Sequence, residues 1–326
     1  MSDLKQKILS AVESDLDDIE KALCDNLNPY LDLVSDVAGH ILFSGGKRLR
    51  PLLMVLSARI CGYTGDYEKT FSTALEYLHT ATLLHDDLVD EAAIRRGKTV
   101  AHATWGNSIA VLVGDYLLAR ALSLSAGTGR LRVVQILAEL TENMSQGEVH
   151  QLMRKGDIEL TEDEYMVVIR RKTAVLFEAA CRVSAIISDA PEEKEMALAQ
   201  YGSNLGIAFQ MADDLFDYTL QTSDFGKEVG ADLREGKLTL PLIYALKQAR
   251  SADRDLMIKI IQDHDFATED FKTLIDLLVK YGAIEYTQKT AAGYIDTAKA
   301  ALSVFEPSPT KETMLDIADY ALMRRV

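Results

Sequence analysis

The stretch LHTATLLHDDLVD, residues 78–90, decides the fold class, because an apolar run with helical spacing leads directly into a group of acids. Its apolar residues recur at intervals of three and four, as do those of residues 134–140, and this period is typical of an amphipathic helix. Strict alternation over strand lengths is hard to find. No proline lies between Pro51 and Pro191, so this long span avoids the strongest helix breaker. The sequence therefore predicts an all-α protein.

Glycine residues punctuate the chain and set the expected number of elements. They separate about ten to thirteen helical segments. The length of 326 residues alone favours about two domains, but no low-complexity linker and no repeat period divides the chain. We therefore expect a single all-helical domain over residues 1–326, with a motif-bearing core at about 32–242 and a C-terminal helical layer at about 243–326.

The composition excludes several classes of function. The chain carries 50 acidic against 35 basic residues, a formal net charge of −15, whereas a general nucleic-acid binder needs basic surface to displace counterions. The three cysteines are far apart and give neither a disulfide framework nor a zinc-binding spacing. No run approaches the ~18 uncharged apolar residues of a membrane-spanning helix. We expect a cytoplasmic protein that binds no nucleic acid and does not insert stably into a membrane.

Two acidic motifs share one spacing. Asp86 and Asp90 of DDLVD are four residues apart, and Asp213 and Asp217 of DDLFD repeat this pattern 127 residues later. Positions i and i+4 share a helix face, and two carboxylates there suit Mg²⁺, which prefers oxygen ligands. A solvated acidic face is the ordinary alternative for one such motif. Both copies are flanked by apolar residues, however, where unpaired carboxylates cost too much without a cation.

Basic residues occur in clusters that complement the acids. Arginine forks and lysine point charges are suited to diphosphate oxygens. The clustered cations are Lys47, Arg48, Arg50, Arg95, Arg96, Arg171, Lys172, Lys227 and Lys237, of which Arg48 or Arg171 is a spare. Walker A, GxGxxG, HExxH and GxSxG motifs are absent from the sequence. Metal-binding acids beside a cationic site suggest removal of a diphosphate, with an apolar pocket that keeps water from the resulting carbocation.

Six motifs in register resemble those of the trans-type polyprenyl diphosphate synthases, most nearly the bacterial octaprenyl type. They are GGKRLRP (45–51), HTATLLHDDLVD (79–90), RRG (95–97), KTAVLFEAA (172–180), FQMADDLFDY (209–218) and GKEVGADLREGKLTLP (226–241). The match runs from about Asp32 to Leu242 and is looser beyond. It implies a helical bundle around a deep central cavity, usually a homodimer. It also implies condensation of isopentenyl diphosphate with an allylic diphosphate such as farnesyl diphosphate.

The resemblance implies a role for each motif residue. Asp86 and Asp90 resemble ligands of two Mg²⁺ ions, and Asp213, helped by Asp217, resembles the ligand of a third. The supporting aspartates are Asp87 and Asp214. The residues that resemble the family's clamp on the allylic diphosphate are Arg95, Lys172, Lys227 and Lys237. Those that resemble the family's site for isopentenyl diphosphate are Lys47, Arg50, His79 and Arg96. Thr173 and Gln210 resemble residues that steady the cation. The implied steps are ionisation of the allylic C–O bond, attack by the isopentenyl double bond, and loss of a proton to the departing diphosphate.

Product length is expected to depend on the helix that precedes the first acidic motif. Small residues lie four and five positions before Asp86, where short-chain members of the family often have an aromatic residue. We call the residues that limit the length of the growing chain the ruler. It is expected to continue down this helix to roughly 16 Å below Asp86 at ~1.5 Å per residue, and a facing helix is expected to close the bottom of the cavity as its floor. The candidate residues are Ala81, Thr82, Leu78 and Leu75 on the first helix and Leu122 and Leu124 on the second. We expect a product of about forty carbons, within about thirty to fifty, because of this depth.

Three alternatives compete with this interpretation. A shorter-chain geranylgeranyl synthase would share every motif. A terpene cyclase would share the first acidic motif, but its second metal motif is usually a different pattern. A regulatory subunit of a heteromeric synthase typically loses one acidic motif, whereas both are intact in this sequence.

Overall fold

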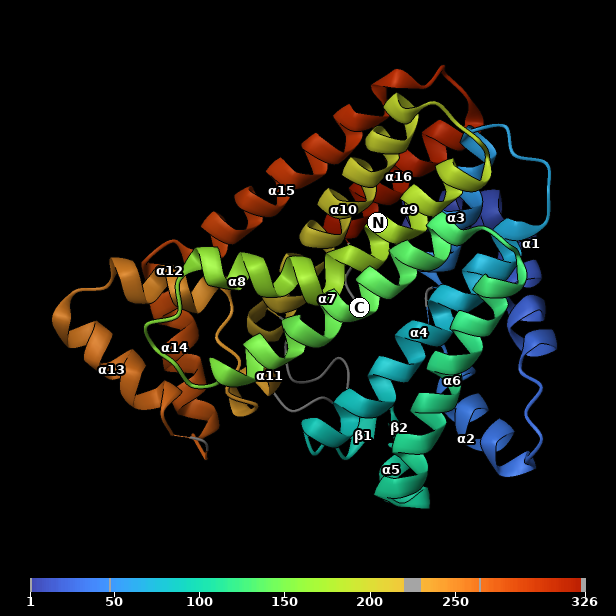
Figure 1. Ribbon diagram of the computed structural model, residues 1–326. Coiled ribbons are helices and arrows are strands. Elements are labelled where there is room, and N and C mark those ends of the chain that lie inside the picture. Colours follow the sequence, from blue (N-terminus) through green and yellow to red (C-terminus); the bar gives the residue numbers. More distant parts are fainter. Residues whose placement is uncertain (1, 47, 220–229, 264, 324–326) are drawn as a thin grey trace. The chain divides into compact units, whose positions relative to one another are not determined.

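The computed structural model describes residues 2–46, 48–219, 230–263 and 265–323, and these are mostly α-helical (Figure 1). The helices are α1 (Ser2–Asn26), α2 (Asp32–Leu42), α3 (Leu49–Ile60), α4 (Tyr67–Val89), α5 (Ala101–Trp105), α6 (Asn107–Gly127), α7 (Leu131–Met153), α8 (Glu162–Ile169), α9 (Val175–Ile187), α10 (Glu192–Thr219), α11 (Ala231–Arg234), α12 (Leu240–Gln248), α13 (Ser251–Ile261), α14 (Thr268–Lys280), α15 (Ala283–Ala301) and α16 (Pro309–Met323). A π-helix, η1 (Arg170–Ala174), joins α8 to α9, and a 3₁₀ turn, η2 (Leu302–Val304), follows α15. The strands β1 (Ile94–Arg95) and β2 (Lys98–Thr99) pair antiparallel.

The all-α prediction is confirmed, but the number of helices lies slightly above the predicted ten to thirteen. The additional elements include single turns such as α5 and α11, with five and four residues. Gly106, with φ of 88°, ends α5, and Gly230, with φ of 76°, precedes α11. One helical turn contains too few residues to show an apolar period, which is why the sequence did not separate these turns from loops.

The described chain forms two compact units, here called unit 1 and unit 2. Unit 1 comprises residues 1–141, 176–202 and 301–317, and unit 2 comprises residues 142–175, 203–300 and 318–326. The boundaries fall inside α7, α9, α10, α15 and α16 rather than in linkers. The expectation of a single domain over the whole chain stays a prediction.

Unit 1 is built around α4, which lies beside α6 (Figure 1). Phe71, Leu75 and Tyr77 of α4 are fully buried, and the Tyr77 hydroxyl donates to the Leu23 carbonyl of α1 at 2.6 Å. A side chain at Gly114 of α6 would lie only 2.3 Å from His85 Nε2. Glycine therefore permits the close approach of α6 to the end of α4 that carries the first acidic motif.

Within the described residues, α6 is the one helix long and apolar enough to cross a membrane. It nevertheless carries Asp115 and Arg120, and its Val113, Leu117 and Ala121 are buried within unit 1. Core helices of globular proteins satisfy the same criteria of length and hydropathy, so this feature is only a weak indication of a membrane span.

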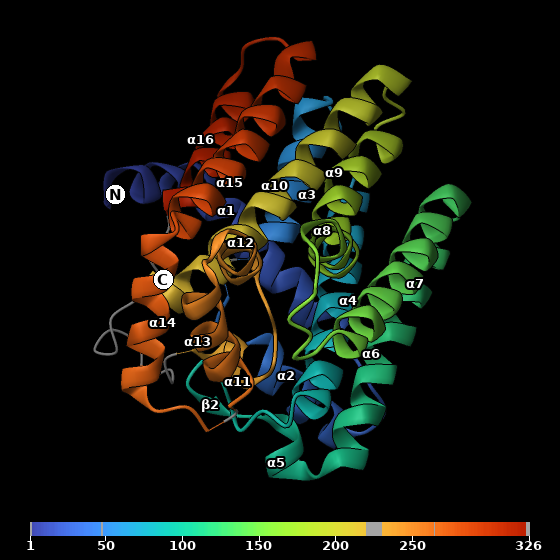
Figure 2. The same cartoon turned by 90° about the vertical axis from the view of Figure 1, so that its left-hand side faces the viewer.

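Unit 2 has its own apolar core, to which α8, α10, α12 and α14 contribute. Figure 2 shows α12, α13 and α14 grouped together in this unit. The ring of Phe271 stacks against those of Tyr218 and Phe266, with centroids 6.0 and 5.6 Å away respectively. Helix α8 begins with a capping box in which the Glu164 amide donates to Thr161 Oγ1 and the Thr161 amide donates to Glu164 Oε2. This cap fixes where α8 starts, and hence which of its residues face the core.

Candidate active site

Cationic side chains gather near the Gly45-Gly46 turn of unit 1. Gly45 has a φ of 91°, in the left-handed region that glycine favours. Its carbonyl oxygen accepts a hydrogen bond from Arg96 Nη1. Arg50, which follows the turn, lies with Nη1 3.1 Å from Nε2 of His79. The charges of Arg50 and Arg96 both lower the pKa of His79. Three of the four residues predicted to bind isopentenyl diphosphate therefore lie in one region.

The fourth predicted residue, Lys47, lies outside the described residues, as does Lys227 of the predicted allylic clamp.

Arg48 is a buried structural residue, which corrects its assignment as a spare diphosphate ligand. It is 5% exposed, and its guanidinium reaches Glu20 Oε1 at 2.5 Å, Glu76 Oε1 at 2.7 Å and the Leu42 carbonyl at 2.6 Å. Its φ of 45° lies in the left-handed region, which is uncommon for residues other than glycine. The other spare, Arg171, is exposed.

His79 is held neutral by its surroundings. Its pKa is well below the usual 6.5, because burial disfavours the charged imidazolium and the neighbouring Arg50 repels it. The unfolded chain takes up a proton below pH 6.5 and the folded chain does not, so stability is present above this pH and lost as the pH falls.

We expect the free energy of unfolding to fall between pH 7.5 and 5.5 by about 1 kcal/mol less in His79→Asn than in the unmodified protein. Urea denaturation of the metal-free protein at the two pH values measures this difference. Equal pH dependence in both proteins would show that the imidazole is charged in the folded state.

The first acidic motif lies at the end of α4. The Asp90 amide donates to the Asp86 carbonyl at 2.8 Å, so the helical spacing continues to the last residue of the motif. Both aspartates are partly buried. Asp87 is 1% exposed, and burial raises the pKa of its carboxyl although Arg95 opposes this. Arg95 Nε donates to Asp87 Oδ1 at 2.5 Å, so the middle aspartate holds a residue of the predicted allylic clamp.

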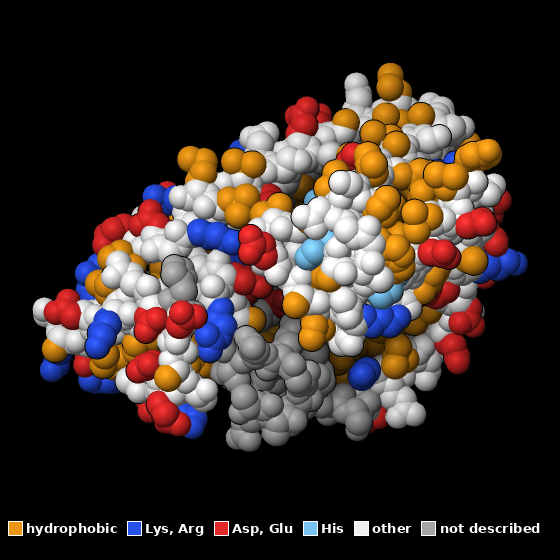
Figure 3. Space-filling model, turned by 90° about the horizontal axis from the view of Figure 1, so that it is seen from below, with side chains coloured by type: hydrophobic (Ala, Val, Ile, Leu, Met, Phe, Trp, Pro, Cys, Tyr) orange, Lys and Arg blue, Asp and Glu red, His pale blue; other side chains and the backbone are white. Residues whose placement is uncertain are grey.

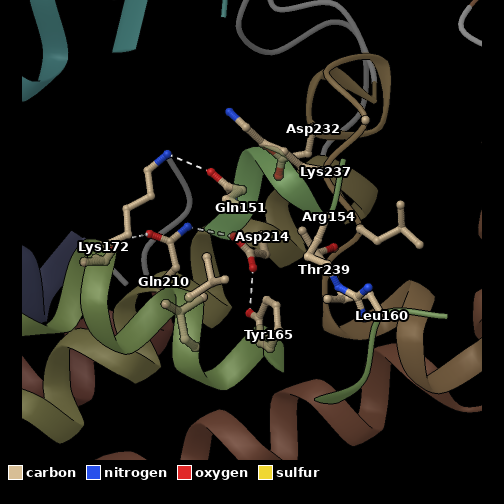
Figure 4. Close-up of a pocket in the computed structure, with 15 residues that line it drawn as sticks. Gln151, Arg154, Leu160, Tyr165, Lys172, Gln210, Asp214, Asp232, Lys237 and Thr239 are labelled. Carbon is tan, nitrogen blue, oxygen red and sulfur yellow. Dashed lines mark hydrogen bonds between the residues drawn. The ribbon is translucent and has the colours of Figure 1, made fainter. Parts of the chain in front are cut away.

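A cavity in unit 2 brings together five of the other predicted residues (Figure 4). Lys172, Thr173, Gln210, Asp214 and Lys237 all line it. Lys172 and Thr173 come from the π-helix η1, Gln210 and Asp214 from α10, and Lys237 from the segment that follows α11. Residues separated by 65 positions in the chain therefore meet around one space.

Lys172 and Thr173, which both line the cavity, lie on a π-helix. Five residues, Arg170–Ala174, form this wider turn, which is frequent at functional sites. Lys172 Nζ donates to Gln151 Oε1 at 2.8 Å and pairs with the Glu148 carboxylate, both on α7. Gly147 permits this packing, because a Cβ there would lie 3.0 Å from the Lys172 amide nitrogen.

Replacing Gly147 with Ala is expected to lower the free energy of unfolding by about 1–3 kcal/mol, because the added methyl group overpacks against the π-helix. We also expect weaker activity, since the shift displaces Lys172. The matched control is Gly293→Ala on α15, where a Cβ meets nothing within 4 Å and stability should rise by about 0.5–1 kcal/mol. Chemical denaturation of both variants measures the difference. If both substitutions raised the free energy of unfolding equally, the π-helix would have to move aside for the added methyl group without any loss of stability.

The second acidic motif divides its carboxylates between three surroundings. Asp213 is exposed, whereas Asp214 is 5% exposed and its pKa is raised to about 7, mainly by burial. Asp217 accepts hydrogen bonds from the amides of Ala231 and Asp232 at 3.1 Å each. Asp217 thus fixes the start of α11, a contact that the sequence did not predict.

The donor chemistry of these acids fits Mg²⁺ bound together with a diphosphate. Within the described residues, no three His, Cys, Asp or Glu side chains converge into a complete metal site. Mg²⁺ commonly takes one or two carboxylates, several waters and substrate phosphate oxygens rather than an all-protein cage. Pairs of aspartates without a third ligand are what such binding requires.

The predicted ruler residues lie in unit 1. Leu75, Leu78 and Ala81 are at most 2% exposed, and Thr82 is partly buried. On α6, Leu122 and Leu124 are partly buried and lie beside the more deeply buried Ala121 and Ser125. The function of these residues as a ruler and floor stays a prediction.

Several residues of the cavity escaped sequence reasoning. Tyr165 contacts Asp214 from a helix 49 residues away, and Glu148, Gln151 and Gly147 support the π-helix from α7. None of them belongs to a motif with a recognisable chemistry. The capping box at Thr161 is the nearest sequence signal, because it fixes the register of the helix that carries Tyr165.

Acidic and basic side chains are interspersed over the face shown in Figure 3 rather than separated by sign.

Comparison with known proteins identifies a family and several relatives. The family model described as polyprenyl synthetase matches residues 31–278. The octaprenyl diphosphate synthase of Escherichia coli is 39% identical over 319 residues, which cover 98% of each chain. Component 2 of the heptaprenyl diphosphate synthase of Bacillus subtilis is 33% identical over 330 residues, which cover 100% of this chain and 92% of the relative.

Two solved structures are similar over 98% of each chain, with a TM-score of 0.92. One is a decaprenyl diphosphate synthase from Rhodobacter capsulatus, 40% identical to this chain. The other is a polyprenyl synthase from Caulobacter crescentus, 39% identical, which was solved in complex with calcium and isoprenyl diphosphate.

Proposed function

Because the chain belongs to the polyprenyl synthetase family and is a prenyltransferase, we propose that it makes an all-trans polyprenyl diphosphate of about forty carbons. The substrates would be isopentenyl diphosphate and an allylic diphosphate such as farnesyl diphosphate. The observation that carries the proposal is the meeting of Lys172, Thr173 and Gln210 with Asp214 of the second acidic motif around one cavity. The length of the product rests on the small residues Ala81 and Thr82 before the first acidic motif.

The cations would bind and orient the two diphosphates. Lys172 and Lys237 line the cavity, and each already has an acidic partner, Glu148 and Glu235 respectively. A diphosphate would replace these carboxylates as the partner of each lysine, and its several oxygens offer stronger charge-assisted hydrogen bonds. In unit 1, Arg50, His79 and Arg96 would bind isopentenyl diphosphate.

The acidic motifs would hold Mg²⁺, on which the family depends in general. Asp86 and Asp90 would bind two ions, and Asp213 with Asp217 a third. When bound, Mg²⁺ withdraws charge from the diphosphate leaving group. The calcium and isoprenyl diphosphate in the Caulobacter crescentus structure support a divalent cation beside an isoprenoid diphosphate.

Thr173 and Gln210 would steady the positive charge that develops on the allylic carbon. Thr173 Oγ1 donates to Gln210 Oε1 at 2.8 Å, so only lone pairs of the hydroxyl remain to face a ligand. Oxygen lone pairs fixed in a dry cavity stabilise a cation without reorganising during the reaction.

The proposal is tested by incubating the purified chain with farnesyl diphosphate, labelled isopentenyl diphosphate and Mg²⁺. We expect products that grow to about forty carbons, measured by mass spectrometry. Products that stop at about twenty carbons would support the geranylgeranyl alternative. Absence of elongation by the chain alone would favour a subunit of a heteromeric synthase, as the similarity to component 2 from Bacillus subtilis suggests.

We further propose that the chain acts as a homodimer. Light scattering of the purified protein gives its mass in solution, and a monomer that elongates at full rate would contradict the proposal.

A further inference from the structure

Tyr165 is a buried tyrosine beside the second acidic motif, and none of the proposed steps uses it. It lies on α8, is 4% exposed, and contributes to the wall of the cavity (Figure 4). Its hydroxyl donates to Asp214 Oδ2 at 2.6 Å. Asp214 is itself 5% exposed, so this contact is made away from water.

The contact belongs to a chain of hydrogen bonds with one direction. Gln210 Nε2 donates to the other carboxylate oxygen, Asp214 Oδ1, at 2.7 Å. Thr173 Oγ1 then donates to Gln210 Oε1 at 2.8 Å. Every donor in the chain therefore points toward Asp214, and Asp214 accepts from both sides.

This direction decides which way the Gln210 amide faces. An amide can bond with its oxygen and nitrogen exchanged, because the two ends have similar shape. With Asp214 as the acceptor, the nitrogen end of Gln210 is drawn to the carboxylate and the oxygen end is left toward Thr173. Asp214 holds this amide only while its own carboxylate is fixed, and Tyr165 supplies the hydrogen bond to the opposite oxygen.

We propose that Tyr165 is a positioning residue that, through Asp214, holds the carbonyl oxygen of Gln210 beside the Thr173 hydroxyl to stabilise the allylic cation. The inference rests on the proposed function, in which these two oxygens face the reacting carbon. It adds a residue outside the recognisable motifs, and it gives the middle aspartate of DDLFD a task besides supporting a metal ion.

Tyr165→Phe removes the hydroxyl and keeps the ring in the core. We expect kcat for elongation to fall by about 10- to 100-fold, as is typical when a residue behind a site is lost. The KM of each substrate and the Mg²⁺ concentration for half-maximal rate should change by less than about twofold, because the variant loses transition-state stabilisation alone.

The matched control is Tyr286→Phe. The Tyr286 hydroxyl also donates to a carboxylate on α8, that of Glu162, at 2.9 Å, but Tyr286 does not line the cavity. Each variant loses one tyrosine–carboxylate hydrogen bond that joins α8 to another helix, so a purely structural effect would appear in both. We expect Tyr286→Phe to keep kcat within about twofold of the unmodified protein.

A double-mutant cycle tests whether Tyr165 acts through Gln210. If it does, adding Tyr165→Phe to Gln210→Ala lowers kcat by less than about twofold more, because the amide to be positioned is already gone. Multiplicative losses would overturn the proposal, as would a raised KM with unchanged kcat.

A measurement without turnover separates this inference from the proposed function. In protein labelled with ¹⁵N-glutamine, the side-chain NH₂ signals of Gln210, assigned by their loss in Gln210→Ala, should move in Tyr165→Phe and stay in place in Tyr286→Phe. Signals unmoved by Tyr165→Phe would refute the positioning role. Moved signals in a protein that does not elongate would contradict the proposed function alone.

Discussion

Replacing Asp86 with Asn is expected to lower kcat/KM for chain elongation by about a thousand-fold, the largest effect of any single substitution proposed for this protein. Asparagine keeps the shape of the side chain and removes the charge that would hold Mg²⁺. The loss of metal leaves the developing charge of the diphosphate without its main stabilisation. Incorporation of labelled isopentenyl diphosphate at saturating Mg²⁺ measures the rate.

Asp87→Asn is the matched comparison. Asp87 is 1% exposed and accepts a hydrogen bond from Arg95 Nε, so its substitution disturbs the arginine rather than a metal ligand. We expect a smaller fall, of about 10- to 100-fold, together with some loss of stability. If Asp86→Asn kept its rate within about tenfold of the unmodified protein, the assignment of Asp86 as a metal ligand would be wrong.

Replacing Ala81 with Tyr is expected to shorten the product from about forty carbons to about fifteen to twenty. Ala81 is 2% exposed and lies five residues, or roughly 7.5 Å along the helix, before Asp86. If this helix forms the proposed ruler, a phenol ring at this height would occupy the space into which the growing chain extends. Product lengths from farnesyl and geranyl diphosphates, separated by reversed-phase thin-layer chromatography, show the change.

The control for this substitution is Ala126→Tyr. Ala126 is exposed near the end of α6, so a tyrosine there should leave product length unchanged. Thermal unfolding of both variants separates a blocked cavity from a damaged core, because overpacking of a buried position costs about 1–3 kcal/mol. A folded Ala81→Tyr protein that still makes the long product would refute the ruler.

The sequence predicted the fold class and five of the residues that line the cavity, and part of this success has a physical reason. Helical period and the i, i+4 spacing of aspartates are local properties, so they can be recognised from residues that lie close together in the sequence. Lys172, Thr173 and Gln210 could be named because they lie inside the stretches that resemble the family motifs, and the structure brings them together.

The remaining features depend on contacts between distant segments. In the sequence, Arg48 looks like one more cation after a glycine turn. In the structure it is buried and hydrogen-bonded to Glu20 and Glu76, each 28 residues away. Tyr165 gains its neighbour Asp214 only when α8 meets α10. Spacing within one segment carries no information about either pairing.

The segment that contains the π-helix constrains the number of residues in this part of the chain, and not only their identity. Between the cap at Thr161 and the start of α9 at Val175, each added or lost residue would turn all later side chains by about 100°. Such a turn would carry Lys172 and Thr173 away from the cavity even if every amino acid were retained. We therefore expect this segment to tolerate substitutions during evolution but not insertions or deletions, so that its length should vary less than its amino-acid sequence.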